Sequence, residues 1–240
     1  MMSAFQVLDE SGWRLCSLLG TTDLIRKKYY LAGGTALALQ LGHRKSYDLD
    51  FFQMGTKDEI NFNEIYRELS GLFSQKNLRV ELKKLDQAII AASGTKLTFR
   101  AYPFPLVEPF VDGREVAESL AGIRLASPRE IALMKAYTIG RRTSYRDYID
   151  LYFLLKTGTI SIKYILEKAP KKFVIDGEPV FSPKLFLEQL AYTEDIPDKE
   201  SALDALIGEK IGSNEIDGYL ARKASEAVKA QLLKRRGPRL

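Results

Sequence analysis

Residues 33–52 constrain the fold of this chain more than any other segment. The segment opens with the pair Gly33-Gly34, continues as a short apolar helical pattern, and ends in a strand pattern that holds Asp48 and Asp50. Side chains two apart on a strand point to the same face, so the two aspartates converge while Leu49 faces the other way. Adjacent carboxylates repel each other and are costly to bury unless a cation neutralises them. An oxygen-preferring ion such as Mg²⁺ suits them.

This arrangement resembles the signature of the nucleotidyltransferase superfamily, in which Gly-Gly or Gly-Ser precedes a helix and an Asp-x-Asp strand. A Gly-Gly pair alone is usually a turn, and Asp-x-Asp alone is usually a solvated strand end. Within the superfamily, the run is most similar to the AbiEii/AbiGii-type toxin family, through Gly33-Gly34-Thr35, His43-Arg44, Ser46 and Asp48-Leu49-Asp50-Phe51-Phe52.

The resemblance assigns a role to each part of the motif. Gly33, Gly34 and Thr35 are expected to form a phosphate-binding turn, because glycine allows close approach and a helix N-terminus favours anions. Asp48 and Asp50 are expected to hold Mg²⁺ or Mn²⁺, with a nucleoside triphosphate as the donor substrate.

The residues between these two elements are less specific. The motif adds Arg44 and Ser46 to the expected nucleotide-binding residues, although Arg44 and Lys45 could equally offset the charge of the aspartates. His43 is the only histidine, which excludes a His-rich zinc site, and we expect it to be structural at a helix end.

Helix and strand patterns alternate before residue 122. Apolar spacing predicts helices over residues 5–19, interrupted at Ser11-Gly12, and 58–74. Short apolar segments predict strands over residues 29–32, 48–52, 78–85, 88–92 and 96–102, with a hairpin turn at Ser93-Gly94. This order fits an α/β (α+β) fold with a small mixed sheet and flanking helices.

The pattern is helical from about residue 123 to the end. Ser127-Pro128-Arg129-Glu130 is typical of a helix start, and Ser144 to Asp147 can start a second helix that runs to about residue 156. Further helices are expected over residues 162–168, 182–190, 199–207 and 215–234, with a turn at 176–179. We therefore expect a nucleotidyltransferase-like core over residues 1–122 and a helical region over 123–240 that completes the active-site cleft.

A second group of residues similar to the same family lies in this helical region. Lys135 stands between apolar neighbours, and Asp147 and Asp150 are three apart and share a helix face. The resemblance implies that Lys135 steadies the triphosphate and that Asp147 assists the attacking hydroxyl or completes a metal shell. Alternatively, an ion-pair cluster of Lys135, Arg141, Arg146, Asp147 and Asp150 fixes how two helices dock, or Asp147 caps its own helix.

One departure from the superfamily concerns a third carboxylate, which many members carry on a later strand. The matching strand here, residues 95–102, has no acid, and Thr98 and Arg100 stand at the alternating positions. Glu81 or Asp86 could substitute, or the aspartates of the helical region could supply the ligand. Reduced activity is one expected consequence.

Composition is that of an ordinary soluble protein. The 240 residues are 45% hydrophobic and 28% charged, and the length allows one large domain or two small ones. No apolar run reaches the roughly 18–20 residues that span a bilayer, and no secretory signal is visible. We therefore expect a cytoplasmic protein with no membrane partner, and Cys16, its single cysteine, as a core residue.

The net charge of +5 comes from the C-terminal tail, where residues 222–240 hold seven basic residues and one acidic residue. Lys234-Arg235-Arg236 and Arg239 could attract RNA, or they could be a solvated helix end.

The motif and its resemblance to the AbiEii/AbiGii-type family together predict a Mg²⁺-dependent nucleotidyltransferase, and the resemblance further implies a toxin of a toxin–antitoxin (abortive infection) system. The resemblance implies transfer of a nucleoside monophosphate to an RNA, such as the end of a tRNA, and a separately encoded antitoxin protein. One alternative is a catalytically degenerate module with the same fold that binds a nucleotide or a partner. A weaker alternative is an enzyme that modifies a small molecule or a protein side chain.

Overall fold

The computed structural model describes residues 6–208 and 210–236, the last three of these by their backbone alone. The chain forms two compact units, residues 1–131 and 132–240, and each is considered by itself. The division falls inside one helix, α6 (Pro128–Thr138). Residue 5, where the first predicted helix begins, and Arg239 lie outside the described residues.

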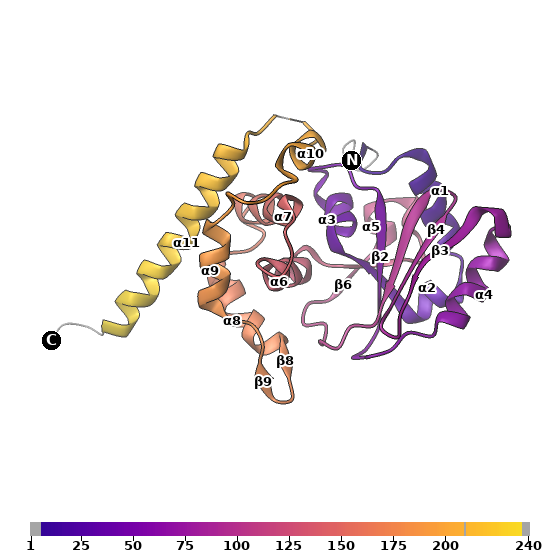
Figure 1. Cartoon of the computed structure of the whole chain (residues 1–240), viewed down its shortest axis with the longest axis horizontal. Helices are drawn as coiled ribbons and strands as arrows, with labels where there is room; N and C mark the ends of the chain where they lie inside the picture. The colour runs from indigo at the N-terminus through magenta and orange to yellow at the C-terminus, as the bar shows by residue number, and fades with distance from the viewer. Residues whose placement is uncertain (1–5, 209, 237–240) are drawn as a thin grey trace. The chain divides into compact units, whose positions relative to one another are not determined.

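The first unit is built on a seven-stranded mixed sheet in the order β3-β4-β5-β2-β1-β7-β6 (Figure 1). Strand β2 lies near the middle, parallel to β5 and antiparallel to β1, and β1 is in turn parallel to β7. The strands are β1 (Tyr29–Ala32), β2 (Asp48–Gln53), β3 (Leu78–Lys83), β4 (Gln87–Ala92), β5 (Thr95–Arg100), β6 (Phe110–Asp112) and β7 (Arg124–Ala126). The predicted α/β class is confirmed, and this sheet has two more strands, β6 and β7, than the sequence analysis predicted.

Alternation along β2 sets the orientation of its side chains. Leu49 and Phe51 are fully buried, whereas Asp48 and Asp50 are partly exposed. The Phe51 ring stacks on Phe99 of β5, with 5.5 Å between centroids, and Tyr29 meets Phe99 edge-on at 5.3 Å. This aromatic core fixes the strand, and because the period is two it also fixes the face that carries both carboxylates.

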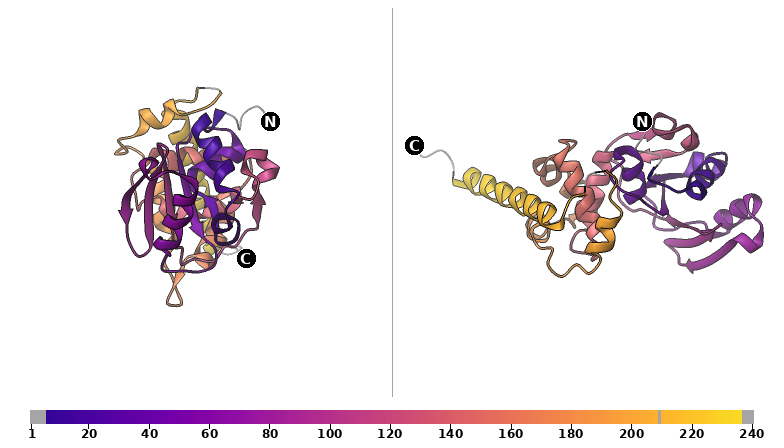
Figure 2. Two further views of the ribbon diagram at one scale, coloured as in Figure 1. Left: turned by 90° about the vertical axis from the view of Figure 1, so that its right-hand side faces the viewer. Right: turned by 90° about the horizontal axis from the view of Figure 1, so that it is seen from above.

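Helices flank the sheet. They are α1 (Glu10–Leu19), α2 (Asp23–Lys28), α3 (Gly33–Leu41), α4 (Phe62–Leu72) and the short α5 (Gly113–Val116), with 3-10 turns η2 (Gln75–Asn77) and η3 (Glu118–Leu120). The first helix begins later than predicted because the Asp9 carboxylate accepts from Gly12 N at 2.7 Å and caps it. Helix α4 is shorter than predicted because Asn61 caps it, and α4 contacts β3 (Figure 2).

The second unit contains the remainder of α6 and the helices α7 (Tyr145–Lys156), α8 (Ile162–Lys172), α9 (Pro183–Ala191), α10 (Lys199–Asp204) and α11 (Ser213–Arg236). A small hairpin of β8 (Val174–Ile175) and β9 (Glu178–Pro179) surrounds the predicted turn. Helix α11 contacts α7, α8 and α9 (Figure 1). The N-terminus of α7 is capped by a residue that is distant in sequence. The Asp198 carboxylate accepts hydrogen bonds from Tyr145 N at 2.7 Å and from Ser144 Oγ at 3.2 Å.

Cys16 is fully buried in α1, as predicted, and burial raises the pKa of its thiol to about 12. Over the described ranges, none of the helices combines the length and the apolar character that a bilayer crossing requires.

Gly20 provides a test of how α1 fits against the loop before β7. A Cβ added at Gly20 would lie 2.2 Å from the backbone oxygen of Ala121, whereas Gly71 in α4 has nothing within 4 Å. We expect Gly20→Ala to lower the free energy of unfolding by about 2 kcal/mol or more, because backbone must move. We expect Gly71→Ala to raise it by about 0.5–1 kcal/mol through helix propensity. Urea titration of both variants checks this, and equal effects of the two would contradict it.

Candidate functional site

The junction between β1 and α3 is the tightest feature of the predicted motif. Ala32 ends β1 opposite Asp50, and α3 begins at the next residue, Gly33, which has φ +67°. A Cβ at Gly33 would lie 2.9 Å from Oδ2 of Asp50. A residue other than glycine would therefore be strained in its backbone and would press on the carboxylate. Ala32, at the N-cap, has no side chain that accepts from the first turn of α3.

Thr35 ties the first turn of α3 to β2. Its hydroxyl donates to the backbone oxygen of Asp48, in a short contact, and lies 2.6 Å from the hydroxyl of Ser46. Since Thr35 has one hydroxyl proton, Ser46 Oγ is the donor in the second bond. Both side chains are buried. Their hydroxyl groups are thus used inside the unit, where they hold the helix start against the strand.

Asp48 and Asp50 lie on the same face of β2, which is the arrangement that two carboxylates need in order to share a cation. The Asp48 side chain is 40% exposed, and its Oδ2 lies 2.9 Å from Nζ of Lys96. Lys96 stands directly beside Asp48 because β5 runs parallel to β2 in that register. The sequence analysis did not assign a role to Lys96, since a parallel partner far along the chain leaves no local pattern.

Strand β5 also shows where a third carboxylate would stand. Thr98 is the register partner of Asp50, and Arg100 is the partner of Phe52. Glu81 is on β3, three strands away from β2, so at about 4.8 Å per strand it is too distant to share an ion with Asp50. Asp86 precedes β4, and its backbone oxygen accepts from Ala101 N, beyond the end of β5. Neither acid takes the third position.

The remaining motif residues are buried. Arg44 is 2% exposed and donates from Nη1 to the backbone oxygen of Lys45 at 3.0 Å, and His43 is 3% exposed. His43 thus has the buried position expected of a structural residue. Gly33 and Gly34 are partly exposed. Of the predicted nucleotide-binding residues in this unit, those two glycines reach the surface, whereas Thr35, Arg44 and Ser46 do not.

Lys135 of the second unit lies in a buried cluster of charged groups. Its Nζ is 2.6 Å from Oδ1 of Asp147 and 2.5 Å from Oδ2 of Asp150, and all three side chains are at most 5% exposed. The ammonium is thus neutralised by two carboxylates from one face of α7, as the three-residue spacing predicts. The stability of such a cluster is sensitive to substitution, because removing one charged partner leaves the opposite charge buried and less well neutralised.

Arg142 completes this cluster. Its Nε and Nη2 donate to the two oxygens of Asp147, each at 2.7 Å, while its side chain remains 57% exposed. Burial alone would raise the pKa of Asp147, but Lys135 and Arg142 outweigh it and hold that pKa below its ordinary value. The sequence analysis named Arg141 and Arg146 here instead. Arg141 donates to the backbone oxygens of Tyr137 and Val180.

A metal ion fits the first unit on chemical grounds. Over residues 6–208 and 210–236 there is no group of three or more Asp, Glu, His or Cys side chains placed to hold a metal. Asp48 and Asp50 nevertheless offer two hard oxygen donors side by side, next to a glycine whose missing Cβ leaves room beside Asp50.

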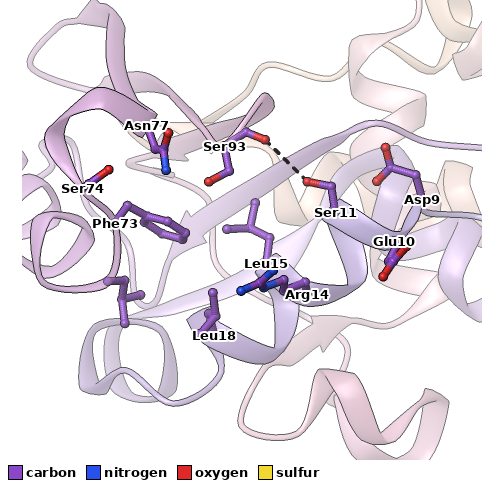
Figure 3. Close-up of a pocket in the computed structure, with 11 residues that line it drawn as sticks. Asp9, Glu10, Ser11, Arg14, Leu15, Leu18, Phe73, Ser74, Asn77 and Ser93 are labelled. Atoms are coloured by element: carbon purple, nitrogen blue, oxygen red, sulfur yellow. Dashed lines mark hydrogen bonds between the residues drawn. The ribbon is translucent and has the colours of Figure 1, made fainter.

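The first unit also has a hollow elsewhere, of about 750 Å³, between α1 and the segment that joins α4 to β3 (Figure 3). Leu15, Leu18 and Phe73 contribute apolar surface, and Arg14 and Asn77 contribute polar groups. None of the predicted site residues lines it. It is therefore separate from the carboxylate pair.

Comparison with known proteins places the chain in a family. Protein aq_aa25 of Aquifex aeolicus (strain VF5) is 34% identical over 145 residues, which span 60% of this chain and 66% of that protein's length. MenT4, a nucleotidyltransferase toxin from Mycobacterium tuberculosis H37Rv, has the same fold with a TM-score of 0.58 at 17% identity. The superposed region covers 94% of this chain and 85% of the MenT4 chain. JHP933 from Helicobacter pylori has a TM-score of 0.52 at 17% identity, and the superposed region covers 95% of this chain and 97% of the JHP933 chain.

Residues 18–222 match the family described as nucleotidyl transferase AbiEii toxin, type IV toxin–antitoxin system. Since the match spans most of the sequence, the chain belongs to the AbiEii nucleotidyltransferase toxin family.

Proposed function

We propose that this protein transfers a nucleoside monophosphate from a nucleoside triphosphate to an RNA acceptor, such as the end of a tRNA, in a Mg²⁺-dependent reaction that Mn²⁺ also supports. The observation that carries the proposal is the pair Asp48 and Asp50, side by side on β2 against the Gly33 junction. Family membership supports the nucleotide donor and a divalent metal. The acceptor is inferred from the resemblance and from the basic tail.

The reaction is an in-line displacement at phosphorus. A hydroxyl oxygen of the acceptor attacks the α-phosphorus, the bond from that phosphorus to the bridging oxygen breaks, and pyrophosphate leaves while the hydroxyl proton passes to a base. Asp48 and Asp50 would hold the metal, which when bound stabilises the charge on the phosphate oxygens. Gly33 and Gly34 would offer N–H groups of the α3 start to the triphosphate. The chain contributes mainly by positioning these groups.

The pair of Lys96 and Asp48 is compatible with metal binding. Both side chains are about 40% exposed, and ion pairs of that kind are worth on the order of 1 kcal/mol or less. A divalent ion can therefore displace the ammonium from Asp48. The freed Lys96 would then be close enough to contact a phosphate oxygen of the same nucleotide.

Lys135 and Asp147 would contribute electrostatic interactions and not proton transfer. We propose that Lys135 steadies the triphosphate and that Asp147 and Asp150 hold its ammonium in place. The lowered pKa of Asp147 makes it a poor proton acceptor near neutral pH, so a positioning role fits it better than that of general base.

In the cell, the protein would act as a toxin in abortive infection, restrained by a separately encoded antitoxin protein. A second candidate function is a non-catalytic module that binds a nucleotide or a partner. The observation that favours it is that β5 (Thr95–Arg100) contains no acid, with Thr98 beside Asp50 and then Arg100 at the alternating positions, on a strand where many superfamily members have one.

The carboxylate pair is tested by the double variant Asp48→Asn/Asp50→Asn. We expect label transfer from α-³²P nucleotides to RNA to fall by roughly 1,000-fold or more, because metal binding needs both charges. The unfolding midpoint should stay equal or rise, because removal of two adjacent negative charges relieves repulsion.

The matched control is Glu81→Gln/Asp86→Asn, which removes one acid of β3 and one of the turn before β4, both away from Asp50. This control should retain transfer. Equal transfer by both double variants would contradict a metal-binding role of the pair, and unlabelled RNA with wild-type protein would favour the binding module.

The role of Lys135 is tested with a compensated variant. Lys135→Met alone should destabilise the protein by about 3–5 kcal/mol, because Asp147 and Asp150 both lose a buried ammonium and the remaining cation, Arg142, is bound to Asp147. Lys135→Met/Asp150→Leu removes the buried pair and leaves Asp147 with Arg142, so much of the stability should return.

If Lys135 steadies the triphosphate, the compensated variant folds but its transfer rate remains about 100-fold or more below that of wild type. Thermal unfolding and the transfer assay are measured on the same samples. If the compensated variant recovers both stability and transfer, the role of Lys135 is structural and not catalytic.

A further inference from the structure

A small hollow of about 210 Å³ lies next to the Lys135 cluster, within the second unit. One side is the loop of Arg141, Arg142 and Thr143, and the other is formed by Gln189 and Tyr192 around the end of α9 and by Asp195. This volume is below the roughly 300–1,000 Å³ of pockets that enclose a whole drug-sized ligand. It suits a single flat ring whose other side stays open to solvent.

The wall formed by α9 is held in place by internal hydrogen bonds. The hydroxyl of Tyr148, on α7, donates to the backbone oxygen of Gln189 at 3.1 Å and lies 3.4 Å from that of Tyr192. Gly140 has φ +78°, and a Cβ there would be 2.7 Å from Cγ of Gln189. The absence of a side chain at Gly140 therefore lets the loop and α9 approach closely.

The rim of the hollow combines an aromatic ring with cations. Tyr192 is 49% exposed, and its hydroxyl donates to Asp195 Oδ2 at 2.5 Å. That hydrogen bond fixes the ring. Arg142 is 57% exposed even though one edge of its guanidinium is bound to Asp147. Arg141 is also exposed and is anchored through two backbone oxygens.

We propose that this hollow binds one unpaired nucleotide, with its base stacked on Tyr192 and its phosphate facing Arg142 and Arg141. An exposed aromatic ring beside arginines is the chemistry by which proteins hold single-stranded bases. Asp195 and Gln189 offer acceptor and donor groups to a base edge, whereas the Asp195 charge disfavours a phosphate on that side. The proposal deepens the proposed function, because such a nucleotide would lie beside Asp147.

The nucleotide can belong to an RNA strand or be free, and the experiment separates the two. The full chain carrying Asp48→Asn/Asp50→Asn is titrated, with EDTA and about 0.2 M salt to weaken tail contacts, into a single-stranded octamer that contains 2-aminopurine. Quenching of the 2-aminopurine reports stacking, and anisotropy of an end label reports binding. Each of the four nucleoside triphosphates is then added as a competitor.

We expect Tyr192→Ala to remove the quenching and to weaken binding by about tenfold or more, and Tyr192→Phe to keep both, because the phenyl ring still stacks. Lys184→Ala is the control, since it removes an exposed charge on α9 away from the hollow. If free nucleoside triphosphates compete with the octamer, the hollow binds a free nucleotide. If they do not compete, the hollow binds a nucleotide that is part of a strand.

The proposal is overturned if the octamer and the mononucleotides all fail to bind, or if Tyr192→Ala binds as its parent does while its unfolding midpoint is unchanged. Neither result depends on catalysis, because transfer is assayed separately in the chain with Asp48 and Asp50 intact. Failure of this inference is therefore distinguishable from failure of the proposed function.

Discussion

The direct passage from β1 into α3 is the constraint on which the first unit depends. No loop separates strand and helix, so Ala32 pairs with Asp50 and the next residue, Gly33, already begins the helix. Because of the positive φ of Gly33 and the short distance to Asp50, a side chain at this position would strain the backbone and displace the Asp50 carboxylate. The Thr35 hydroxyl then binds the backbone of Asp48. A helix N-terminus and two carboxylates are thereby held together by the backbone of a central strand.

The sequence predicted those elements whose signals are local. Period-two alternation in β2 and the Ser127-Pro128 start of α6 are confirmed, because both depend on neighbouring residues. Strands β6 and β7 were missed, since each has three residues and forms only by pairing within the sheet. The family and the fold class are confirmed because the motif joins several such local signals at a fixed spacing.

The candidate site shows the same division between local and distant signals. The spacing of Asp147 and Asp150 indicated a shared helix face, which the structure has. The cost of burying Lys135 indicated that its ammonium meets either triphosphate oxygens or a carboxylate, and the structure pairs it with both aspartates. Arg142 was missed because a loop places it, and adjacent arginines in a loop cannot be told apart from sequence. Lys96 was missed because its proximity to Asp48 arises from parallel pairing between strands distant in sequence.

The contact of Lys96 with Asp48 has a consequence for the order in which ligands arrive. With an ammonium 2.9 Å from one of its two carboxylates, the free protein presents less negative charge to a lone divalent ion than two bare aspartates would. A triphosphate brings its own negative charge, which compensates the displaced lysine. We therefore expect a lone divalent ion to bind less tightly, by about fivefold at most, than an ion that enters together with the nucleotide.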